Sequence, residues 1–118
     1  MTLNLMNSFG IKSAVKGNKI SIKNQEFSSG SYIVESDWSA ASYWYSILSI
    51  SDNINNLTLK GLKKKSNQGD SVISELMKSF GVNTQYKKDG IVLTKIKFDT
   101  EEIELDFRDC PDLAQTIL

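Results

Sequence analysis

The chain has 118 residues, of which 40% are hydrophobic and 24% are charged, and its 14 basic side chains balance 14 acidic ones. These values are close to the average for globular domains and exclude a disordered tail, and a zero net charge gives no overall field to attract a polyanion such as nucleic acid. Because no apolar run approaches the roughly 20 residues that span a bilayer, a membrane protein is also excluded.

The first predicted elements are a helix that ends at Phe9 and a β-hairpin behind it. Apolar and polar residues alternate from Ile11 to Val15 and again from Lys19 to Lys23. The segment Lys16-Gly17-Asn18 between them is typical of a tight hairpin turn. A short strand is then predicted over Tyr32-Ile33-Val34, after a polar connection.

A long helix is predicted over residues 38–50, with Asp37 at its N-cap. Its apolar residues spread around most of the circumference: Trp38, Ala40, Ala41, Tyr43, Trp44, Tyr45, Ile47, Leu48 and Ile50. A helix of this kind is stable only when it is covered on nearly all sides, so we expect it at the centre of the full protein. The aromatic residues in it are accordingly interpreted as core rather than as a ligand-stacking surface.

The following segment predicts a strand over Ile54–Leu59, a lysine-rich loop and a second helix capped by Asp70. The helix has one apolar face and ends at Gly81; the face consists of Val72, Ile73, Leu76, Met77 and Phe80. The loop contains Lys60, Lys63, Lys64 and Lys65, which we interpret as solvated because no aromatic residues lie among them.

The last predicted elements are a second hairpin, a strand and the start of another helix. The hairpin joins Val82–Tyr86 to Ile91–Ile96 around Lys88-Asp89-Gly90. A strand over Ile103–Phe107 is followed by Asp112, which is predicted to cap the new helix as Asp37 caps the earlier one.

One phrase occurs twice in the chain. Residues 5–11 read Leu-Met-Asn-Ser-Phe-Gly-Ile, and residues 76–82, 71 positions later, read Leu-Met-Lys-Ser-Phe-Gly-Val. A fixed period of this length indicates one supersecondary unit per repeat, here strand, helix, strand, helix, strand, strand. The predicted class is α+β, with the second half of one unit at 1–30, a complete unit at 31–100 and the start of the next at 101–118. We therefore expect a section of a longer repeat protein.

Histidine is absent from the sequence. Its absence excludes Ser-His-Asp and Cys-His arrangements and the usual zinc sites with histidine ligands, so any catalysis would depend on carboxylates, Lys, Arg or Tyr. No metal site or cofactor is predicted. The single cysteine, Cys110, excludes an internal disulfide and is interpreted as a small buried residue. With no signal-peptide pattern at the N-terminus, a reducing cytoplasm is the expected location.

Four phrases in order resemble the 3-phosphoshikimate 1-carboxyvinyltransferases, or EPSP synthases. They are Thr2-Leu3-Asn4-Leu5-Met6 with Phe9-Gly10, the stretch from Tyr32 to Tyr43, Ser66-Asn67-Gln68-Gly69-Asp70, and Pro111-Asp112-Leu113-Ala114-Gln115-Thr116. The similarity covers essentially the whole chain. The family usually has Gly where Ser36 stands and a small residue where Trp38 stands, which puts the local loop shape in question.

The resemblance implies an enzyme of two like domains, each made of three such units, with helices packed inward and sheets outward as an α-β prism. The family transfers the enolpyruvyl group of phosphoenolpyruvate to the 5-hydroxyl of shikimate 3-phosphate, on the route to chorismate and the aromatic amino acids. A cytoplasmic, monomeric parent enzyme that needs no cofactor and no nucleic-acid or membrane partner is implied. The chain alone is expected to be inactive, because the cations that hold the substrates belong to other segments of the family.

The resemblance places one working residue, Asp112, as the base that takes the hydroxyl proton and as a contact to the shikimate hydroxyls. Asp37 is a second candidate for substrate binding. For both residues a plain N-cap is the alternative interpretation.

Three other functions stay open from the sequence. They are a stand-alone α+β binding module without catalysis, a nucleic-acid binder that uses the lysine loop, and a sibling enzyme that transfers the same enolpyruvyl group to a nucleotide sugar. The Asp-Trp-Ser-Ala-Ala-Ser-Tyr phrase at 37–43 argues against the sibling enzyme.

Overall fold

The computed structural model describes residues 1–98 and 102–117. The chain forms two compact units, Met1–Val34 and Glu35–Leu118. The first is the smaller of the two, and the second contains both aspartates that the sequence selects as candidate site residues, Asp37 and Asp112.

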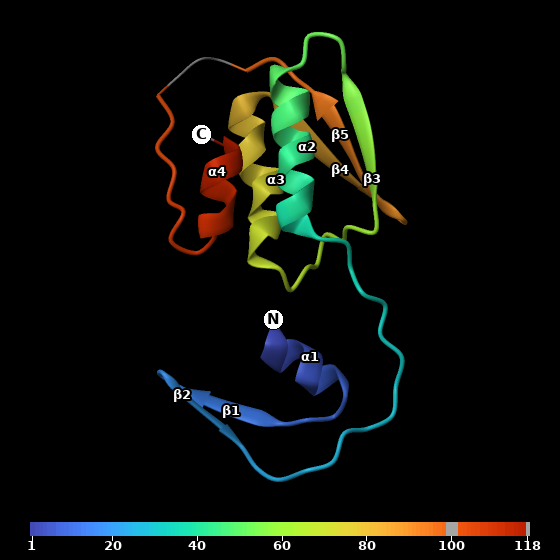
Figure 1. The fold of residues 1–118 in the computed structure, drawn as a ribbon, viewed down its shortest axis with the longest axis vertical. Helices are drawn as coiled ribbons and strands as arrows, with labels where there is room; N and C mark the ends of the chain where they lie inside the picture. The colour runs from blue at the N-terminus through green and yellow to red at the C-terminus, as the bar shows by residue number, and fades with distance from the viewer. Residues whose placement is uncertain (99–101, 118) are drawn as a thin grey trace. The chain divides into compact units, whose positions relative to one another are not determined.

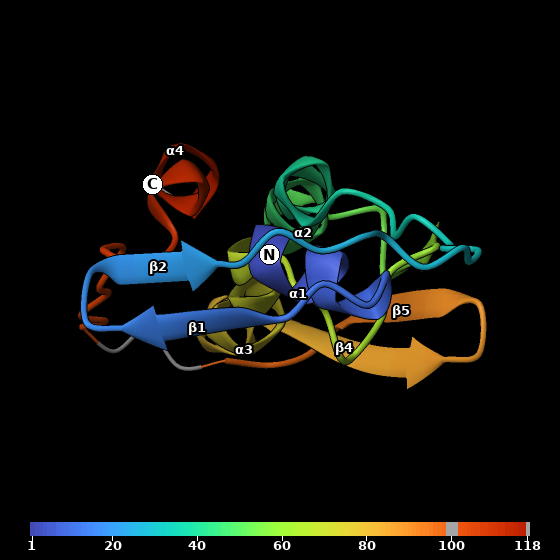
Figure 2. The same ribbon diagram turned by 90° about the horizontal axis from the view of Figure 1, so that it is seen from below.

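The first unit contains a helix and a hairpin (Figure 2): α1 (Thr2–Ser8), β1 (Ser13–Lys16) and β2 (Lys19–Ile22). The two strands are antiparallel, with Val15 opposite Ile20. The turn between them needs a glycine, because Gly17 has a φ of 57°, in the left-handed region that side chains disfavour. Both the helix and the hairpin predicted from the sequence are confirmed.

The second unit contains a three-stranded antiparallel sheet in the order β3-β5-β4, with β3 at Asn56–Lys60, β4 at Val82–Lys87 and β5 at Gly90–Lys95. β5 is the central strand, and its Ile91 and Leu93 are fully buried. At the start of β5 the backbones of two strands approach closely. A Cβ added to Gly90 would lie 2.1 Å from the carbonyl oxygen of Leu59, so only glycine fits there.

Helices cover one face of this sheet (Figure 1). They are α2 (Trp38–Ile50), the composite helix η1 (Gly69–Val72), α3 (Ile73–Leu76) and η2 (Met77–Phe80), and the short pair η3 (Pro111–Leu113) and α4 (Ala114–Ile117). The composite helix ends at Gly81, whose φ is 78°. Both the predicted end of this helix and the predicted bounds of α2 are confirmed.

The core of the second unit lies between these helices and the sheet. Its buried apolar residues are Trp38, Ala41, Tyr45, Leu48, Leu62, Ile73, Met77, Val82, Ile91, Leu93, Cys110 and Leu113. Thus Trp38 and Tyr45 are core aromatics and Cys110 is buried, as expected. The other side of α2 is different, because Tyr43 and Trp44 are 51% and 48% exposed.

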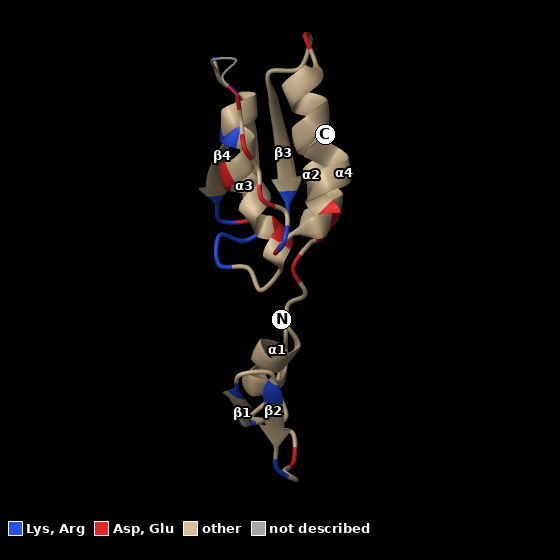
Figure 3. Ribbon diagram, turned by 90° about the vertical axis from the view of Figure 1, so that its left-hand side faces the viewer, with Lys and Arg blue, Asp and Glu red and all other residues tan. Residues whose placement is uncertain are grey.

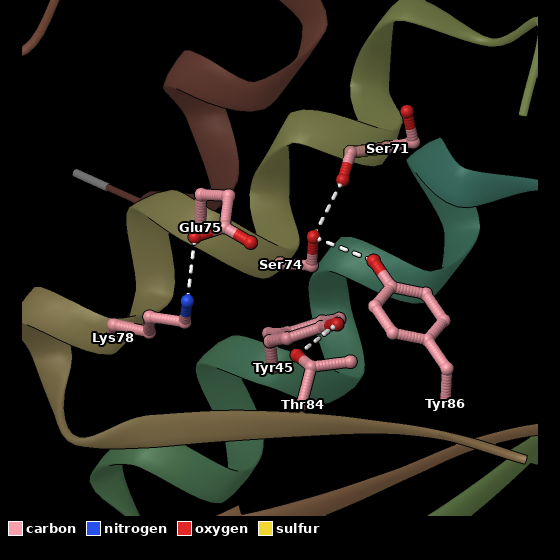
Figure 4. A network of polar contacts seen from close by, with 7 residues as sticks. All are labelled: Tyr45, Ser71, Ser74, Glu75, Lys78, Thr84 and Tyr86. Atoms are coloured by element: carbon pink, nitrogen blue, oxygen red, sulfur yellow. Dashed lines mark hydrogen bonds and ion pairs between the residues drawn. The ribbon is translucent and has the colours of Figure 1, made fainter. Parts of the chain in front are cut away.

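Buried and partly buried hydroxyl groups between the helices and the sheet are paired (Figure 4). The hydroxyl of Tyr45 lies 2.7 Å from that of Thr84, and Tyr86 donates to Ser74 Oγ at 2.9 Å. Burial raises the pKa of Tyr45 strongly, which keeps its hydroxyl neutral. These bonds let polar tips lie in an apolar core without loss of hydrogen bonding.

Two predicted strands are absent. Residues 32–34 and 103–107, all of which the structure describes, are irregular. Ile33 and Val34 are 79% and 82% exposed. Their β-branched sequence favours extended backbone, but a strand also needs ladder hydrogen bonds to a neighbouring strand, and neither residue belongs to a sheet of the described residues.

The predicted cap of the composite helix is also wrong. Asp70 lies inside η1, whose N-cap is Gln68. The turn begins before Asp70 because Gly69 takes a helical conformation, and the Asp70 carboxylate instead accepts a hydrogen bond from the hydroxyl of Ser39 on α2. Asp70 therefore links two helices rather than capping one.

Candidate functional site

Asp112 is the second residue of η3, the turn that leads into α4. The N-cap of this turn is Cys110, so the prediction that Asp112 is the N-cap is wrong. The turn begins two residues earlier than expected because Pro111, whose φ is preset for a helix, occupies its first position. The Asp112 side chain is exposed, and the described part of the chain offers it no hydrogen-bond or ion-pair partner.

The residues around Asp112 hold its backbone in place. Leu113 is fully buried, Cys110 is 4% exposed, and the Leu113 N–H donates to the carbonyl oxygen of Cys110 at 3.1 Å. The next turn is anchored to α2, because the amide of Gln115 donates to the hydroxyl of Tyr43 at 3.2 Å. The arrangement presents a solvated carboxylate on a fixed backbone.

Asp37 occupies the N-cap of α2, as predicted. Its Oδ1 accepts hydrogen bonds from the backbone N–H groups of Ser39 and Ala40 at 2.8 and 3.3 Å. The side chain is exposed and lies at the rim of an open hollow of about 300 Å³. Residues from α2, β3 and the loop behind β3 line this hollow, among them Ala40, Trp44, Leu59, Lys60 and Leu62.

A polar network that the sequence did not predict lies beside Asp37. The carboxylate of Glu35 is its centre. Glu35 Oε1 accepts from the Trp38 indole N–H at 3.0 Å and from the Lys63 backbone N–H at 2.8 Å. Its Oε2 accepts from the Ser66 hydroxyl at 2.6 Å and from the Gln68 amide at 3.4 Å.

Gln68 completes this network. Its Oε1 accepts from the Trp38 backbone N–H at 2.9 Å, and its Nε2 donates to the Ser36 carbonyl oxygen at 2.9 Å. The N–H of Trp38 has no partner within α2, since it belongs to the first helical turn. The side chain of Gln68 therefore supplies the acceptor that this helix start requires.

The charge of Glu35 is stabilised by its neighbours. Burial by itself would raise the pKa of this carboxyl, but the hydrogen bonds from Ser66, Trp38, Lys63 and Gln68 together outweigh that effect, and the pKa is lowered. Glu35 is thus an ionised hydrogen-bond acceptor that joins the start of α2 to the loop at 63–68.

Lys60, Lys63, Lys64 and Lys65 are exposed, as the sequence predicted. Figure 3 shows the basic positions of this loop in blue. The ammonium group of Lys64 lies 5.8 Å from the centre of the Tyr86 ring, a cation–π geometry. The Lys63 backbone is bound to Glu35. Two residues of the loop therefore contact other parts of the second unit: Lys64 contacts Tyr86, and the Lys63 N–H binds Glu35.

The described residues hold no cluster of metal-ligating side chains. Among residues 1–98 and 102–117, no group of three or more His, Cys, Asp and Glu side chains is arranged to hold a metal ion. No helix in the same residues is both long enough and apolar enough to cross a membrane.

Comparison with known proteins identifies the family. The sequence model of EPSP synthase (3-phosphoshikimate 1-carboxyvinyltransferase) matches residues 1–118. The chain belongs to the EPSP synthase family. The resemblance inferred from the four phrases is thereby confirmed over the whole sequence.

Several 3-phosphoshikimate 1-carboxyvinyltransferases are similar to the chain. The protein from Bacteroides fragilis strain YCH46 is 42% identical over 119 residues, which cover 100% of this chain and 29% of that protein. The protein from Methanocaldococcus jannaschii is 35% identical, over 99% of this chain and 27% of its own length. The chain therefore spans somewhat more than a quarter of the length of these EPSP synthases.

We predict that Asp37→Ala lowers the free energy of unfolding by about 1 kcal/mol, because the N–H groups of Ser39 and Ala40 lose their acceptor. Urea unfolding followed by circular dichroism measures the change. Asp52→Ala, an exposed aspartate beyond the other end of α2, is the matched control and should change stability much less. Equal effects of the two substitutions would argue against the capping role.

The lowered pKa of Glu35 predicts a dependence of stability on pH. A carboxyl whose pKa is lower in the folded than in the unfolded chain contributes stability above the unfolded value of about 4.3 and loses it as pH falls through the folded value. Glu35→Gln should therefore be less stable than wild type at neutral pH, with the difference shrinking below about pH 4.

Urea unfolding at a series of pH values tests this expectation. Glu75→Gln is the control, because Glu75 is an exposed carboxylate that forms an ion pair with exposed Lys78 on the same helical segment. A difference between wild type and Glu35→Gln that stays constant from neutral to acid pH would show that the charge of Glu35 does not matter.

Proposed function

We propose that the chain is a section of an EPSP synthase, the enzyme that transfers the enolpyruvyl group of phosphoenolpyruvate to the 5-hydroxyl of shikimate 3-phosphate. The observation that carries the proposal is the family match over all 118 residues. The relatives that bear this enzyme's name are more than three times as long as the matched section, so the section contributes part of the site and the rest of the enzyme completes it.

Asp112 is the proposed base of the reaction. As the 5-hydroxyl oxygen forms its bond to the carbon of phosphoenolpyruvate that bears the phosphate, the Asp112 carboxylate takes the hydroxyl proton, and the bond from that carbon to the phosphate oxygen is broken when phosphate leaves. The local geometry suits this role, because the side chain is exposed and the buried residues beside it fix its backbone. Asp112 also lies in the Pro-Asp-Leu-Ala-Gln-Thr phrase on which the family resemblance depends.

Asp37 is the proposed second contact to substrate. One of its oxygens is occupied by two backbone N–H groups, which fixes the direction of the carboxylate and leaves the other oxygen to accept a hydrogen bond from a hydroxyl. The side chain is exposed at the rim of the hollow beside α2. It would orient substrate rather than remove a proton.

The larger fold that we propose consists of repeat units at 1–30, 31–100 and 101–118, arranged as in an α-β prism. The registers of the two hairpins support it. Val15 pairs with Ile20 in the first, and Tyr86 pairs with Ile91, both 71 residues later, in the second. Ile91 is buried in the core of the second unit, whereas Ile20 is 57% exposed. The first hairpin thus exposes an apolar residue, Ile20, where the second hairpin buries Ile91 against the helices of its own unit. We propose that the missing part of the first repeat unit covers Ile20 in the same way.

The exposed side of α2 supports the same proposal. No charged residue occurs in α2, and Tyr43, Trp44 and Ile47 are between 41% and 51% exposed. α4, which follows Asp112 as α2 follows Asp37, packs against α2 through Gln115 and Tyr43. A helix that corresponds to α2 in a further repeat unit would cover Trp44 and Ile47. The helices would then lie at the centre of the domain, with the sheets outside them.

The proposed enzyme is a cytoplasmic monomer that needs no cofactor and binds shikimate 3-phosphate and phosphoenolpyruvate. The balance of 14 basic and 14 acidic residues gives no support to a nucleic-acid partner.

We predict that the purified 118-residue chain releases no phosphate from phosphoenolpyruvate and shikimate 3-phosphate, because stabilisation of the developing charge by cations is usually a large part of catalysis and the rest of the enzyme supplies them. A phosphate-release assay measures this, with the Bacteroides fragilis relative as positive control. Clear turnover by the chain alone would refute the proposal that it is an incomplete part of the site.

The role of Asp112 can be tested in a chimera in which this chain replaces the matching section of the Bacteroides fragilis relative. Asp112→Asn should lower kcat by about a hundredfold or more, since general base catalysis contributes on that order. The KM for shikimate 3-phosphate should change much less. Asp109→Asn, an exposed aspartate just before the turn, is the control. An unchanged kcat in Asp112→Asn would remove Asp112 from the mechanism.

A further inference from the structure

We propose that Glu35 and Gln68 are positioning residues that hold Asp37 in the direction that substrate binding requires. The inference rests on the proposed function, in which Asp37 is the second contact to substrate. Neither side chain touches the hollow that Asp37 lines, so both would act through the backbone on either side of it.

The segment 35–38 is held on both sides of Asp37. Before it, Glu35 accepts two hydrogen bonds through each carboxylate oxygen, and the Ser36 carbonyl oxygen accepts from Gln68 at 2.9 Å. After it, Trp38 is bound through its backbone N–H to Gln68 and through its indole N–H to Glu35. The backbone on both sides of Asp37 is therefore fixed by two side chains.

The Asp37 side chain is exposed and binds its own helix start rather than these two side chains. The carboxylates of Glu35 and Asp37 are two residues apart in the sequence, but they accept hydrogen bonds from different parts of the unit. Glu35 is bound to the loop at 63–68, whereas Asp37 accepts from the N–H groups of Ser39 and Ala40 and has a φ of −77° and a ψ of 119°, the extended conformation of an N-cap.

The loop at 63–68 is a firm anchor for this purpose. The Gln68 N–H donates to the Ser66 hydroxyl at 3.0 Å, and that hydroxyl donates to Glu35. Just before the loop, the Ser36 N–H donates to the carbonyl oxygen of Gly61 at 3.0 Å. The approach is so close that a Cβ on Gly61 would lie 2.2 Å from Ser36 Oγ, and Gly61 has a φ of 80°. Glycine is therefore strongly favoured at this contact.

A carboxylate at 35 and an amide at 68 are both required by the hydrogen bonds. Every partner of Glu35 is a donor, so the acceptor-only character of a carboxylate fits all of them. Gln68 must accept from the Trp38 N–H and donate to the Ser36 carbonyl oxygen, which an ionised glutamate in its place could not do. The lowered pKa of Glu35 agrees with this set of donors.

A double-mutant cycle in the chimera with the Bacteroides fragilis relative tests the inference. In the chimera, Glu35→Gln and Gln68→Ala should each lower kcat/KM by about tenfold or more, since small misplacements of positioned groups have effects of this size. In an Asp37→Ala background the same substitutions should lower kcat/KM by less than about twofold, because the group through which they act is gone. A purely structural role would give the same loss in both backgrounds and would overturn the inference.

A second measurement uses the 118-residue chain and does not depend on activity. In Glu35→Gln and Gln68→Ala, hydrogen exchange at the backbone N–H groups of Ser39 and Ala40, which bind Asp37, should accelerate by about tenfold. Exchange at the Ser51 N–H, which donates to the Ile47 carbonyl oxygen at the other end of α2, should change much less. Equal acceleration at both ends would indicate general loosening of the helix and would contradict positioning.

Two control substitutions match the change in chemistry. Glu75→Gln converts an exposed carboxylate to an amide, and Ser49→Ala removes a side-chain hydrogen bond to the Phe80 carbonyl oxygen near the other end of α2. Neither should reduce kcat/KM or alter exchange at Ser39. An inactive chimera with the unaltered section would count against the proposed function, while the exchange measurement would still decide whether Glu35 and Gln68 hold Asp37.

Discussion

Trp38 is the residue on which the second unit depends, because it joins the apolar core to the polar network at the start of α2. Its ring is fully buried, and its centre lies 6.5 Å from that of the Tyr86 ring on the sheet. Its two N–H groups are bound by Glu35 and Gln68. Burial of so large a side chain contributes several kcal/mol only if its polar atoms are satisfied. The core and the network therefore stabilise each other, and the position of Asp37 follows from both.

The sequence predicted the elements whose determinants are local. The hairpin turns, the Asp37 cap and the end of the composite helix at Gly81 each depend on a few adjacent residues, and all are present in the structure. Features that depend on distant partners were missed. The segment predicted as a strand at 32–34 belongs to neither sheet of the described residues, and the network joins Glu35 to Gln68 across 33 positions, a contact that no short-range pattern reveals. The caps predicted at Asp70 and Asp112 failed because Gly69 and Pro111 begin their turns earlier.

The candidate site was predicted by a different route. Periodicity and spacing indicated only N-caps at Asp37 and Asp112, and the family resemblance supplied their chemical roles. The structure adds the property that spacing could not give, which is that both carboxylates are exposed while the residues next to them are buried or bound. Glu35 shows the converse. It lies in a phrase that the resemblance included, yet its function as an acceptor of four hydrogen bonds became visible only when the loop at 63–68 was placed beside it.

The two aspartates differ in a way that fits the two roles proposed for them. Each stands at the start of a helical segment, but Asp37 has an oxygen occupied by two backbone N–H groups, whereas Asp112 makes no such bond within the described residues. In Asp37 the oxygen that accepts both N–H groups fixes the direction of the carboxylate, and the other oxygen remains for a substrate hydroxyl. A carboxylate with both oxygens unengaged can take a proton without first breaking a bond. Pro111 therefore bears on the proposed chemistry. By beginning the turn one residue before Asp112, it places the carboxylate outside the capping position, where the proposed base has no hydrogen bond to break among the described residues.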